Sequence, residues 1–276
     1  MSSRPLNDGD HHPQSMARTL SEVQAIDCAQ ELAEAERTRC PVDLFTTRFP
    51  GFSWADARAI ARVRDQLRLG AGDECIGYKL GWTSEAMRQA LGISQPNWGT
   101  LWRSQLVGSE LELSDLVNAK LEPELVYQVG PSPAEGRWAL GLEVVDPRFG
   151  GYHFDWLDNT ADNSSCSRVT IGNFVDQTSA SRPDTFDPAA VAIRFTDGVE
   201  THHGLGSSVM GSPASAVEWL STSLTEEGMS LDVGHIVFTG GLAPPFDVTP
   251  GTTYRVEADD PYQVLGTVEL TTAAKD

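Results

Sequence analysis

Residues 120–129 read KLEPELVYQV, a short run in which one proline separates two glutamates. This run contains valine and tyrosine, which are common in strands, and it reads as a β-strand. Alternate strand residues point to the same side, so Glu122 and Glu124 should leave one face roughly 6.5–7 Å apart along the backbone. Two carboxylates facing one space repel each other unless a cation lies between them. The run therefore predicts either a cation site or an exposed strand face on which both glutamates are solvated.

A third carboxylate occurs in residues 138–145, which read WALGLEVV and alternate as a second strand. Leu140 and Leu142 would share one face, and Glu143 would lie among small and apolar residues on the other. Burial of a lone acid is costly unless it gains a partner. Three carboxylates without a neighbouring histidine or thiolate form an all-oxygen site, suited to Mg²⁺, Mn²⁺ or Ca²⁺ rather than zinc or copper.

A lysine on a third predicted strand is the next candidate. Residues 75–82 read CIGYKLGW, and Lys79 shares one face with Gly77 and Gly81. These small neighbours should leave room for a ligand beside the ammonium group. Lys79 would then be an electrostatic clamp on an anionic substrate or, with a lowered pKa, a general acid and base. The alternative is a surface lysine on a strand.

Helical patterns precede these strands. Apolar residues recur at three-residue steps from Val23 to Leu32, which predicts an amphipathic helix over residues 19–39. A second helix should begin at the capping-box-like sequence that follows Ser53 and end at Gly70.

The order of elements predicts the fold class. Further strands are expected at residues 168–175, 190–197, 235–240, 252–258 and 264–271, with one helix that begins at Ser212-Pro213 and ends at Gly228. Strands that follow one another with few intervening helices indicate a mostly antiparallel or mixed α+β fold rather than a βαβ array. We expect a disordered leader over residues 1–17, a helical segment over 18–72 and a β-rich catalytic domain over 73–276.

Composition limits the function. The 276 residues carry 20 basic and 39 acidic side chains, and the net charge of −19 argues against nucleic acid and anionic membranes as partners. The sequence has no apolar run of membrane-spanning length and no secretory leader, so a cytoplasmic location is expected. The four cysteines are irregularly spaced, which favours reduced thiols over disulfides or zinc. No phosphate-binding glycine motif supports nucleotide chemistry.

Six short motifs follow one another along the chain: GYKLGWTS at 77–84, QPNWG at 95–99, EPE at 122–124, LEVV at 142–145, DNTADNSSC at 158–166 and TGGL at 239–242. Each motif is weak alone, but the series resembles the 2-keto-4-pentenoate hydratase and 4-oxalocrotonate decarboxylase branch of the fumarylacetoacetate hydrolase superfamily. The likeness covers about residues 20–272. It implies a distorted β-barrel or β-roll core preceded by helices.

The resemblance also implies a site. Matched position by position, the ligands of one Mg²⁺ or Mn²⁺ ion would be Glu122, Glu124 and Glu143, and the family lysine would be Lys79. The residues expected to line the substrate pocket are Gln95, Ser165 with its neighbours, Thr239 and Gly240.

One position departs from the family pattern. Family members commonly have an aspartate, a candidate acid or base, where this chain has Asn97. An asparagine does not transfer protons at ordinary pH, but it can orient a water or a substrate carboxylate. Either Lys79 and a water carry the proton steps, or the chain acts on a related substrate.

The implied activity is that of a metal-dependent lyase acting on a 2-keto acid, which would chelate the ion through a carboxylate oxygen and the 2-oxo oxygen. The main interpretation is hydration of a 2-hydroxy-2,4-dienoate to a 4-hydroxy-2-keto acid, as in aromatic-ring catabolism. Two alternatives stay open: decarboxylation of a 4-oxalocrotonate-type 2-keto diacid, and a non-catalytic partner subunit. The resemblance further implies a homo-oligomer and allows association with a partner enzyme of the same pathway.

Overall fold

The computed structural model describes residues 17–176, 186–259 and 261–274 of the chain. The predicted leader lies outside the described residues except for Ala17, so it stays a prediction. The division into a helical segment and a β-rich domain also remains a prediction.

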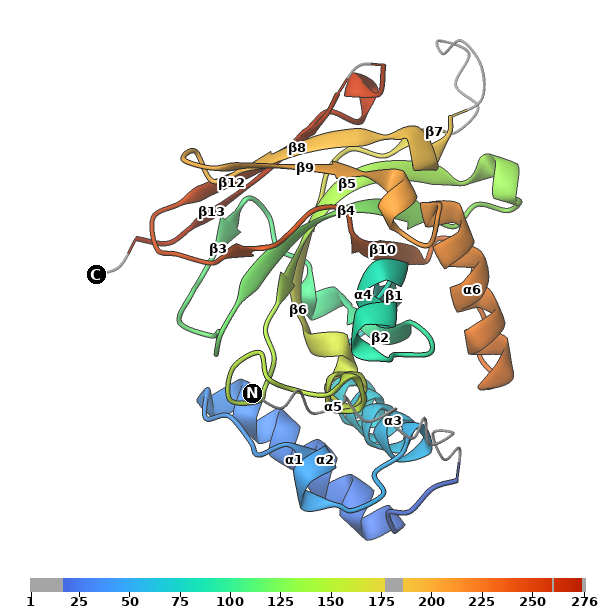
Figure 1. Cartoon of the computed structure of the whole chain (residues 1–276), viewed down its shortest axis with the longest axis vertical. Helices are drawn as coiled ribbons and strands as arrows, with labels where there is room; N and C mark the ends of the chain where they lie inside the picture. Colours follow the sequence, from blue (N-terminus) through green and yellow to red (C-terminus); the bar gives the residue numbers. More distant parts are fainter. Residues whose placement is uncertain (1–16, 177–185, 260, 275–276) are drawn as a thin grey trace, which may run out of the picture.

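The described helices and strands are shown in Figure 1. The helices are α1 (Glu22–Thr38), α2 (Phe45–Arg48), α3 (Trp54–Gly70), α4 (Glu85–Leu91), α5 (Trp156–Ala161) and α6 (Pro213–Glu226). The strands are β1 (Cys75–Gly81), β2 (Asn97–Trp102), β3 (Glu110–Leu111), β4 (Lys120–Gln128), β5 (Arg137–Val145), β6 (Cys166–Ile171), β7 (Val175–Asp176), β8 (Ala192–Thr196), β9 (Thr201–Leu205), β10 (Ile236–Gly241), β11 (Phe246–Asp247), β12 (Thr253–Ala258) and β13 (Thr267–Thr272). Among the described helices, none is long and apolar enough to cross a membrane.

The strands form two sheets. The larger sheet has the order β2-β1-β10-β4-β5-β6, with β11 on β4 and β7 on β5, and the smaller sheet has the order β3-β13-β12-β8-β9. In the larger sheet, β1 and β10 are parallel, whereas β4 is antiparallel to both β10 and β5. Leu140 of β5 and Leu270 of β13 are fully buried in one core that both sheets share. The predicted mixed α+β fold is confirmed, and the larger sheet curls as a half-barrel (Figure 1).

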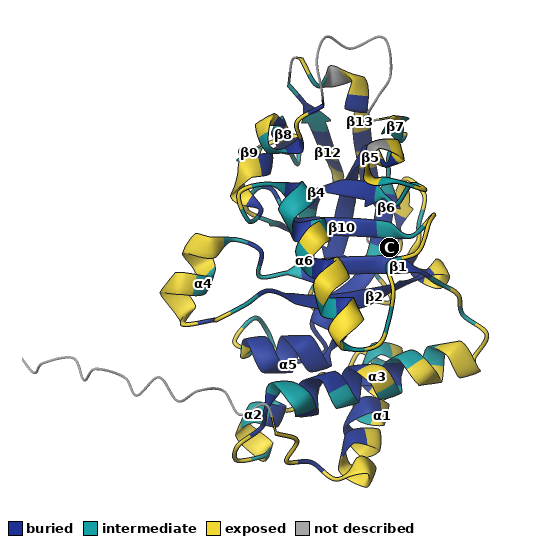
Figure 2. Cartoon of the chain, turned by 90° about the vertical axis from the view of Figure 1, so that its right-hand side faces the viewer, coloured by how far each residue is buried: buried dark blue, intermediate teal, exposed yellow. Residues whose placement is uncertain are grey.

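The N-terminal helices lie at one end of the molecule, where α3 packs between α1 and α5 (Figures 1 and 2). Capping boxes at Ser21 and Ser53 begin α1 and α3, because each serine accepts from a backbone N–H in the first turn. The predicted apolar face of α1 is wrong at its start, since Val23 is 66% exposed. The buried face instead carries mostly small residues, which let the helices approach closely: Ala25, Cys28, Ala29, Leu32 and Ala35.

Two elements near the site, β2 and α5, were not expected from the sequence. All six residues of each are buried (Figure 2). An element buried on every side has no polar face, so its sequence lacks the periodicity that reveals a helix or a strand.

Candidate metal centre

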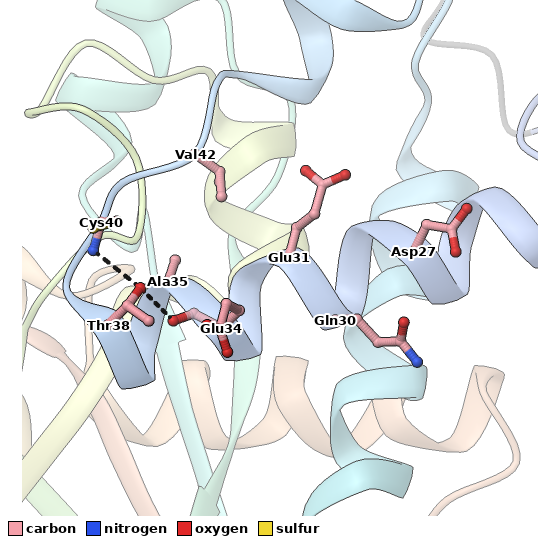
Figure 3. Close-up of a pocket in the computed structure, with 8 residues that line it drawn as sticks. All are labelled: Asp27, Gln30, Glu31, Glu34, Ala35, Thr38, Cys40 and Val42. Atoms are coloured by element: carbon pink, nitrogen blue, oxygen red, sulfur yellow. Dashed lines mark hydrogen bonds between the residues drawn. The ribbon is translucent and has the colours of Figure 1, made fainter.

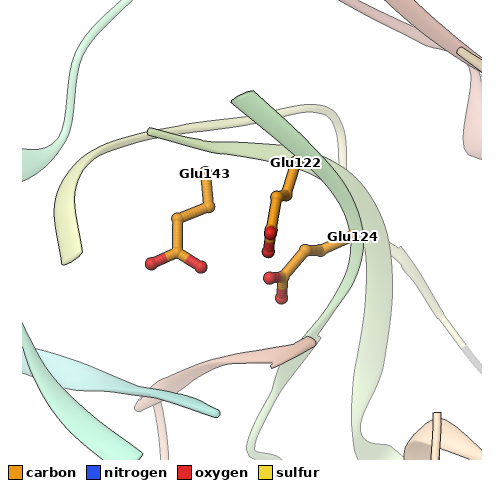
Figure 4. Close-up of side chains that lie close together, drawn as sticks. All are labelled: Glu122, Glu124 and Glu143. Atoms are coloured by element: carbon orange, nitrogen blue, oxygen red, sulfur yellow. The ribbon is translucent and has the colours of Figure 1, made fainter. Parts of the chain in front are cut away.

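Glu122, Glu124 and Glu143 converge on one side of the larger sheet. In the antiparallel pair of β4 and β5, Glu122 lies opposite Glu143 and Glu124 lies opposite Gly141. One carboxylate oxygen from each glutamate lies within 4.8 Å of the others. Figure 4 shows the three carboxylates pointing into one space. Glu124 and Glu143 are fully buried, whereas Glu122 is partly exposed, so the cluster approaches solvent on the Glu122 side.

The chemistry of this cluster suits a hard cation. Glu124 Oε1 and Glu143 Oε2 are buried without a hydrogen-bond partner among the described residues, and Glu143 Oε1 has only an ion pair with Lys79 Nζ. Burial, and then the charge of Glu143, raise the pKa of Glu122 to about 7. The same two causes raise the pKa of Glu124 well above its ordinary value. Three carboxylates this close together do not all ionise unless a positive charge lies beside them. A set of ligands made only of oxygen atoms fits Mg²⁺ or Mn²⁺.

Lys79 supplies one positive charge beside the glutamates. Its Nζ lies 3.1 Å from Glu143 Oε1 and donates to the backbone oxygen (2.9 Å) and the hydroxyl (3.1 Å) of Ser164. Burial opposes the charge of this lysine, but Glu143 and the other nearby acidic groups outweigh burial and raise the pKa of Lys79.

The protein itself packs against the two glycines beside Lys79, and room for a ligand at the ammonium group stays a prediction. A Cβ at Gly81 would lie 2.4 Å from Asn97 Oδ1 and from Ser164 Oγ, and a Cβ at Gly77 would lie 1.9 Å from Ile236 O. The two glycines therefore allow the protein itself to pack against the lysine strand.

A β-bulge in β10 places Thr239 and Gly240 at the site. Phe238 pairs with Val126 and Gly241 with Glu124, so β10 has one extra residue between these pairs. Gly240 has a φ of +112°, and its backbone N–H donates to Glu124 Oε2 (2.7 Å). Thr239 Oγ1 donates to the backbone oxygen of Leu125 (2.8 Å). The bulge thus frees a backbone donor that orients one of the candidate ligands.

Asn97 and Ser165 lie in the segments that pack around Lys79. Asn97 is fully buried, and its side chain contacts Asn159, Thr160 and Ser164. Ser165 is also buried, and its Oγ accepts from Asn159 Nδ2 (2.8 Å). Gln95 is partly buried at a bend just before β2.

Sequence reasoning named Ser165 with its neighbours but did not single out Ser164, the serine that contacts Lys79. The DNTADNSSC motif has two adjacent serines, and the sequence does not say which one turns toward the lysine. The backbone decides this, because Asn163, Ser164 and Ser165 all have positive φ values between 51° and 57°.

A hollow on the surface of α1 lies apart from these residues (Figure 3). None of the predicted site residues lines it, and its lining consists of Asp27, Gln30, Glu31, Glu34, Ala35, Thr38, Cys40 and Val42.

Comparison with known proteins decides the family. The chain is 30% identical over 280 residues to the 2-keto-4-pentenoate hydratase of Burkholderia vietnamiensis, which covers 95% of this chain and 98% of that protein. It is 28% identical over 267 residues to a 4-oxalocrotonate decarboxylase of Pseudomonas putida, covering 92% of this chain and 98% of that one. The chain belongs to the 2-keto-4-pentenoate hydratase and 4-oxalocrotonate decarboxylase family. The resemblance inferred from the six motifs is thereby confirmed. No protein-family model matches the chain.

Solved structures agree with this family. The 4-oxalocrotonate decarboxylase from Pseudomonas putida G7, complexed with magnesium and adipate, superimposes with a TM-score of 0.84 at 25% identity, covering 93% of this chain and 100% of that one. Fumarylpyruvate hydrolase from Pseudomonas aeruginosa shares the fold with a TM-score of 0.53 at 18% identity, covering 72% of this chain and 89% of that one. The predicted fumarylacetoacetate-hydrolase-like core is therefore confirmed for this hydratase and decarboxylase family member.

Proposed function

We propose that this chain is a divalent-metal-dependent lyase that hydrates a 2-hydroxy-2,4-dienoate, of the 2-keto-4-pentenoate type, to a 4-hydroxy-2-keto acid. The observation that carries the proposal is the convergence of Glu122, Glu124 and Glu143 beside the ammonium group of Lys79. The chain's relatives include hydratases from several bacteria, and one of them is named for a 2-hydroxyhexa-2,4-dienoate substrate.

The three glutamates would hold Mg²⁺ or Mn²⁺. When bound, the ion would supply a Lewis acid where negative charge develops as the 2-keto acid becomes an enolate. Gly240 supports this role, because its N–H holds one oxygen of Glu124 and leaves Glu124 Oε1 without a hydrogen-bond partner among the described residues. The neighbouring residues proposed to line the substrate pocket are Gln95, Ser165, Thr239 and Gly240.

Lys79 would act on the substrate's charge. An ammonium group has three N–H donors. The backbone oxygen and the hydroxyl of Ser164 accept from Lys79 Nζ, and Glu143 Oε1 lies 3.1 Å from the same nitrogen. A buried ammonium group held beside the carboxylate cluster would stabilise an anionic substrate and assist the proton transfer that accompanies water addition.

The test begins with the purified chain. Its content of divalent metal would be measured, followed by the loss of absorbance of 2-hydroxypentadienoate with Mg²⁺, with Mn²⁺ and after chelation. We expect turnover with either metal, none after chelation, and recovery when Mg²⁺ is restored. Undiminished turnover in chelator would reject the metal-dependent mechanism.

Decarboxylation is the second candidate, because the superimposed decarboxylase is described in complex with magnesium and adipate, a six-carbon diacid. In that case the same three glutamates and Lys79 would stabilise the dienolate that remains after CO₂ leaves. Release of CO₂ from 2-oxo-3-hexenedioate with Mg²⁺, without hydration of 2-hydroxypentadienoate, would assign the chain to this reaction.

We further propose a cytoplasmic homo-oligomer that allows association with a partner enzyme of the same pathway. Light scattering on the purified chain would report the number of subunits. A non-catalytic subunit would instead show no turnover alone and would co-purify with an active partner enzyme.

A further inference from the structure

A series of hydrogen bonds links Trp82 to Lys79, and the donor and acceptor of each bond are defined. It starts just after β1, where Trp82 Nε1 donates to Asn159 Oδ1 (2.9 Å). An indole N–H can only donate, so this contact fixes which side of the Asn159 amide carries the oxygen. Asn159 Nδ2 accordingly donates to Ser165 Oγ (2.8 Å).

Asn97 is the next residue in this series of hydrogen bonds. Its Nδ2 donates both to Asn159 Oδ1 (2.7 Å) and to Thr160 Oγ1 (2.9 Å). The Thr160 hydroxyl donates its own proton to the backbone oxygen of Trp156 (2.7 Å), so it accepts from Asn97. With the amide nitrogen held by two acceptors, Asn97 Oδ1 must face the other way, and there it accepts from Ser164 Oγ (3.0 Å).

Ser164 is the last residue in the series and contacts Lys79. Its hydroxyl proton is directed to Asn97, so the lone pairs of Ser164 Oγ are free to accept from Lys79 Nζ (3.1 Å). Its backbone oxygen accepts from the same nitrogen (2.9 Å). Both oxygens face one ammonium group because Ser164 has a φ of +51°, a conformation that L residues disfavour.

The turn that carries Ser164 is held from its other side. Asn163 Oδ1 accepts from the backbone N–H of Thr100 (2.7 Å), and Asn163 Nδ2 donates to the backbone oxygen of Thr100 (2.9 Å). The side chain of Asn163 therefore pairs with β2 as a strand would. These contacts hold residues 163–165 in a backbone conformation that is unfavourable by itself. Such held conformations are common at functional sites.

We propose that Asn97 and Ser164 are positioning residues for Lys79: Asn97 orients the Ser164 hydroxyl as an acceptor, and Ser164 aims the ammonium group at the carboxylate cluster. This role rests on the proposed lyase function of the site. It differs from a role for Asn97 in contacting water or substrate, because all its side-chain donors and its oxygen are engaged by protein groups.

The proposal explains why residue 97 is an amide in this chain. An aspartate carboxylate has no N–H to offer Asn159 Oδ1 and Thr160 Oγ1, and it would place one oxygen against another. Trp82 prevents Asn159 from presenting its nitrogen instead. Proton transfer by residue 97 and positioning by residue 97 therefore predict opposite effects of Asn97→Asp.

The kinetic experiment compares wild type with Ser164→Gly, Ser164→Ala and Asn97→Asp. Glycine suits the positive φ of residue 164 and removes only the side chain, so that variant should fold. We expect kcat to fall about 10–100-fold in all three variants, with KM and Mg²⁺ affinity changed less than about threefold. An unchanged kcat in both Ser164 variants, or a higher kcat in Asn97→Asp, would overturn the proposal.

Thr46→Val is the matched control. It removes another hydrogen bond to the same segment, from Thr46 Oγ1 to Asp158 Oδ2 (2.5 Å), that does not lead to Lys79. We expect a lower Tm with kcat within about twofold of wild type. A fall in kcat as large as that of Ser164→Gly would assign the effect to general loosening and overturn the positioning role.

A structural readout separates this proposal from the proposed reaction. If wild type turns over neither substrate, the lyase function fails, and crystal structures of wild type and Ser164→Gly then decide the positioning role. We expect Lys79 Nζ to contact both oxygens of Ser164 in wild type and to shift by more than about 1 Å, or occupy several rotamers, in the variant. An unmoved Nζ in the variant would overturn the proposal.

Discussion

Glu122 of β4 and Glu143 of β5 are cross-strand neighbours, directly opposite each other in an antiparallel ladder. Like charges in such a pair destabilise a sheet. The third carboxylate, Glu124, approaches within 4.8 Å through its nearest oxygen instead of avoiding the pair. An arrangement that is unfavourable for the sheet alone is favourable for binding a cation, and the following expectations derive from that relationship.

Removal of one carboxylate should strongly weaken metal binding without unfolding the protein. Loss of groups that only support metal ligands costs 10–100-fold in affinity, so Glu124→Gln should weaken Mg²⁺ binding by more than about 100-fold. Titration calorimetry and turnover would measure this, with the exposed Glu110→Gln as control. The Tm without metal should not fall, because mutual repulsion among the glutamates decreases. Wild-type Mg²⁺ affinity in Glu124→Gln would contradict the assignment.

Metal should stabilise the wild-type fold. A ligand that binds only the folded state at 100 times its Kd adds about 2.7 kcal/mol to the free energy of unfolding. We therefore expect Mg²⁺ or Mn²⁺ alone to raise the Tm of wild type in thermal unfolding and to leave the Tm of Glu124→Gln unchanged. Equal increases in both proteins would indicate that the ion binds elsewhere.

Lys79→Met keeps an unbranched side chain, one heavy atom shorter, and removes its charge. If the ammonium group steadies a proton in the reaction, kcat should fall by roughly 10²–10⁴-fold. Steady-state kinetics at saturating Mg²⁺ would measure the change, and circular dichroism would verify the fold. A rate equal to that of wild type would show that Lys79 takes no part in the chemistry.

Gly240→Ala should disturb both the fold and the metal site. A Cβ at this position would lie 2.1 Å from Thr83 Oγ1, whereas one at Gly234, which also has a positive φ, meets no atom within 4 Å. Gly234→Ala should cost only backbone strain, about 1–3 kcal/mol. Gly240→Ala should cost about 1–3 kcal/mol more through overpacking, and only this variant should lose Mg²⁺ affinity. Denaturant unfolding of both variants would compare them, and equal losses would contradict the role of the bulge.

Glu36 should make stability depend on pH. Burial alone would raise the pKa of Glu36, but Arg148, Arg64 and Arg68 together lower it from 4.5 to about 2. The unfolded chain then binds the proton more tightly, so the contribution is complete above about pH 4.5 and is lost as pH falls toward 2.

Glu36→Gln tests this sign. Glu36 bonds to Arg64 (3.1 Å) and Arg68 (2.6 Å), and its side chain is 25% exposed. We expect a loss on the order of 2 kcal/mol at pH 7, after allowance for solvent screening, that shrinks as pH falls from 4.5. Thermal unfolding from pH 3 to 7 would measure it, with Glu110→Gln as control. A difference from wild type that stays constant across this range would contradict the ion-pair explanation.

Much of the fold and of the candidate site followed from local sequence. The two-residue period of a strand placed Glu122 and Glu124 on one face, and that holds wherever the strand lies in the sheet. The capping sequences at Ser53 and Ser212 marked helices that the structure contains, because caps depend on neighbouring residues. The order of six motifs was sufficient to indicate the family.

Other features were decided only by contacts between distant parts of the chain. The register of β4 against β5 set Glu122 opposite Glu143, and the bulge in β10 turned the Gly240 N–H toward Glu124. The left-handed turn brought Ser164, rather than Ser165, to Lys79 across 85 residues of sequence. Sequence by itself determined which residues could carry charge and on which face they lay, because these properties are local. The tertiary structure alone decided which charges and hydrogen-bond donors meet, because such meetings depend on register, bulges and packing between segments far apart in the chain.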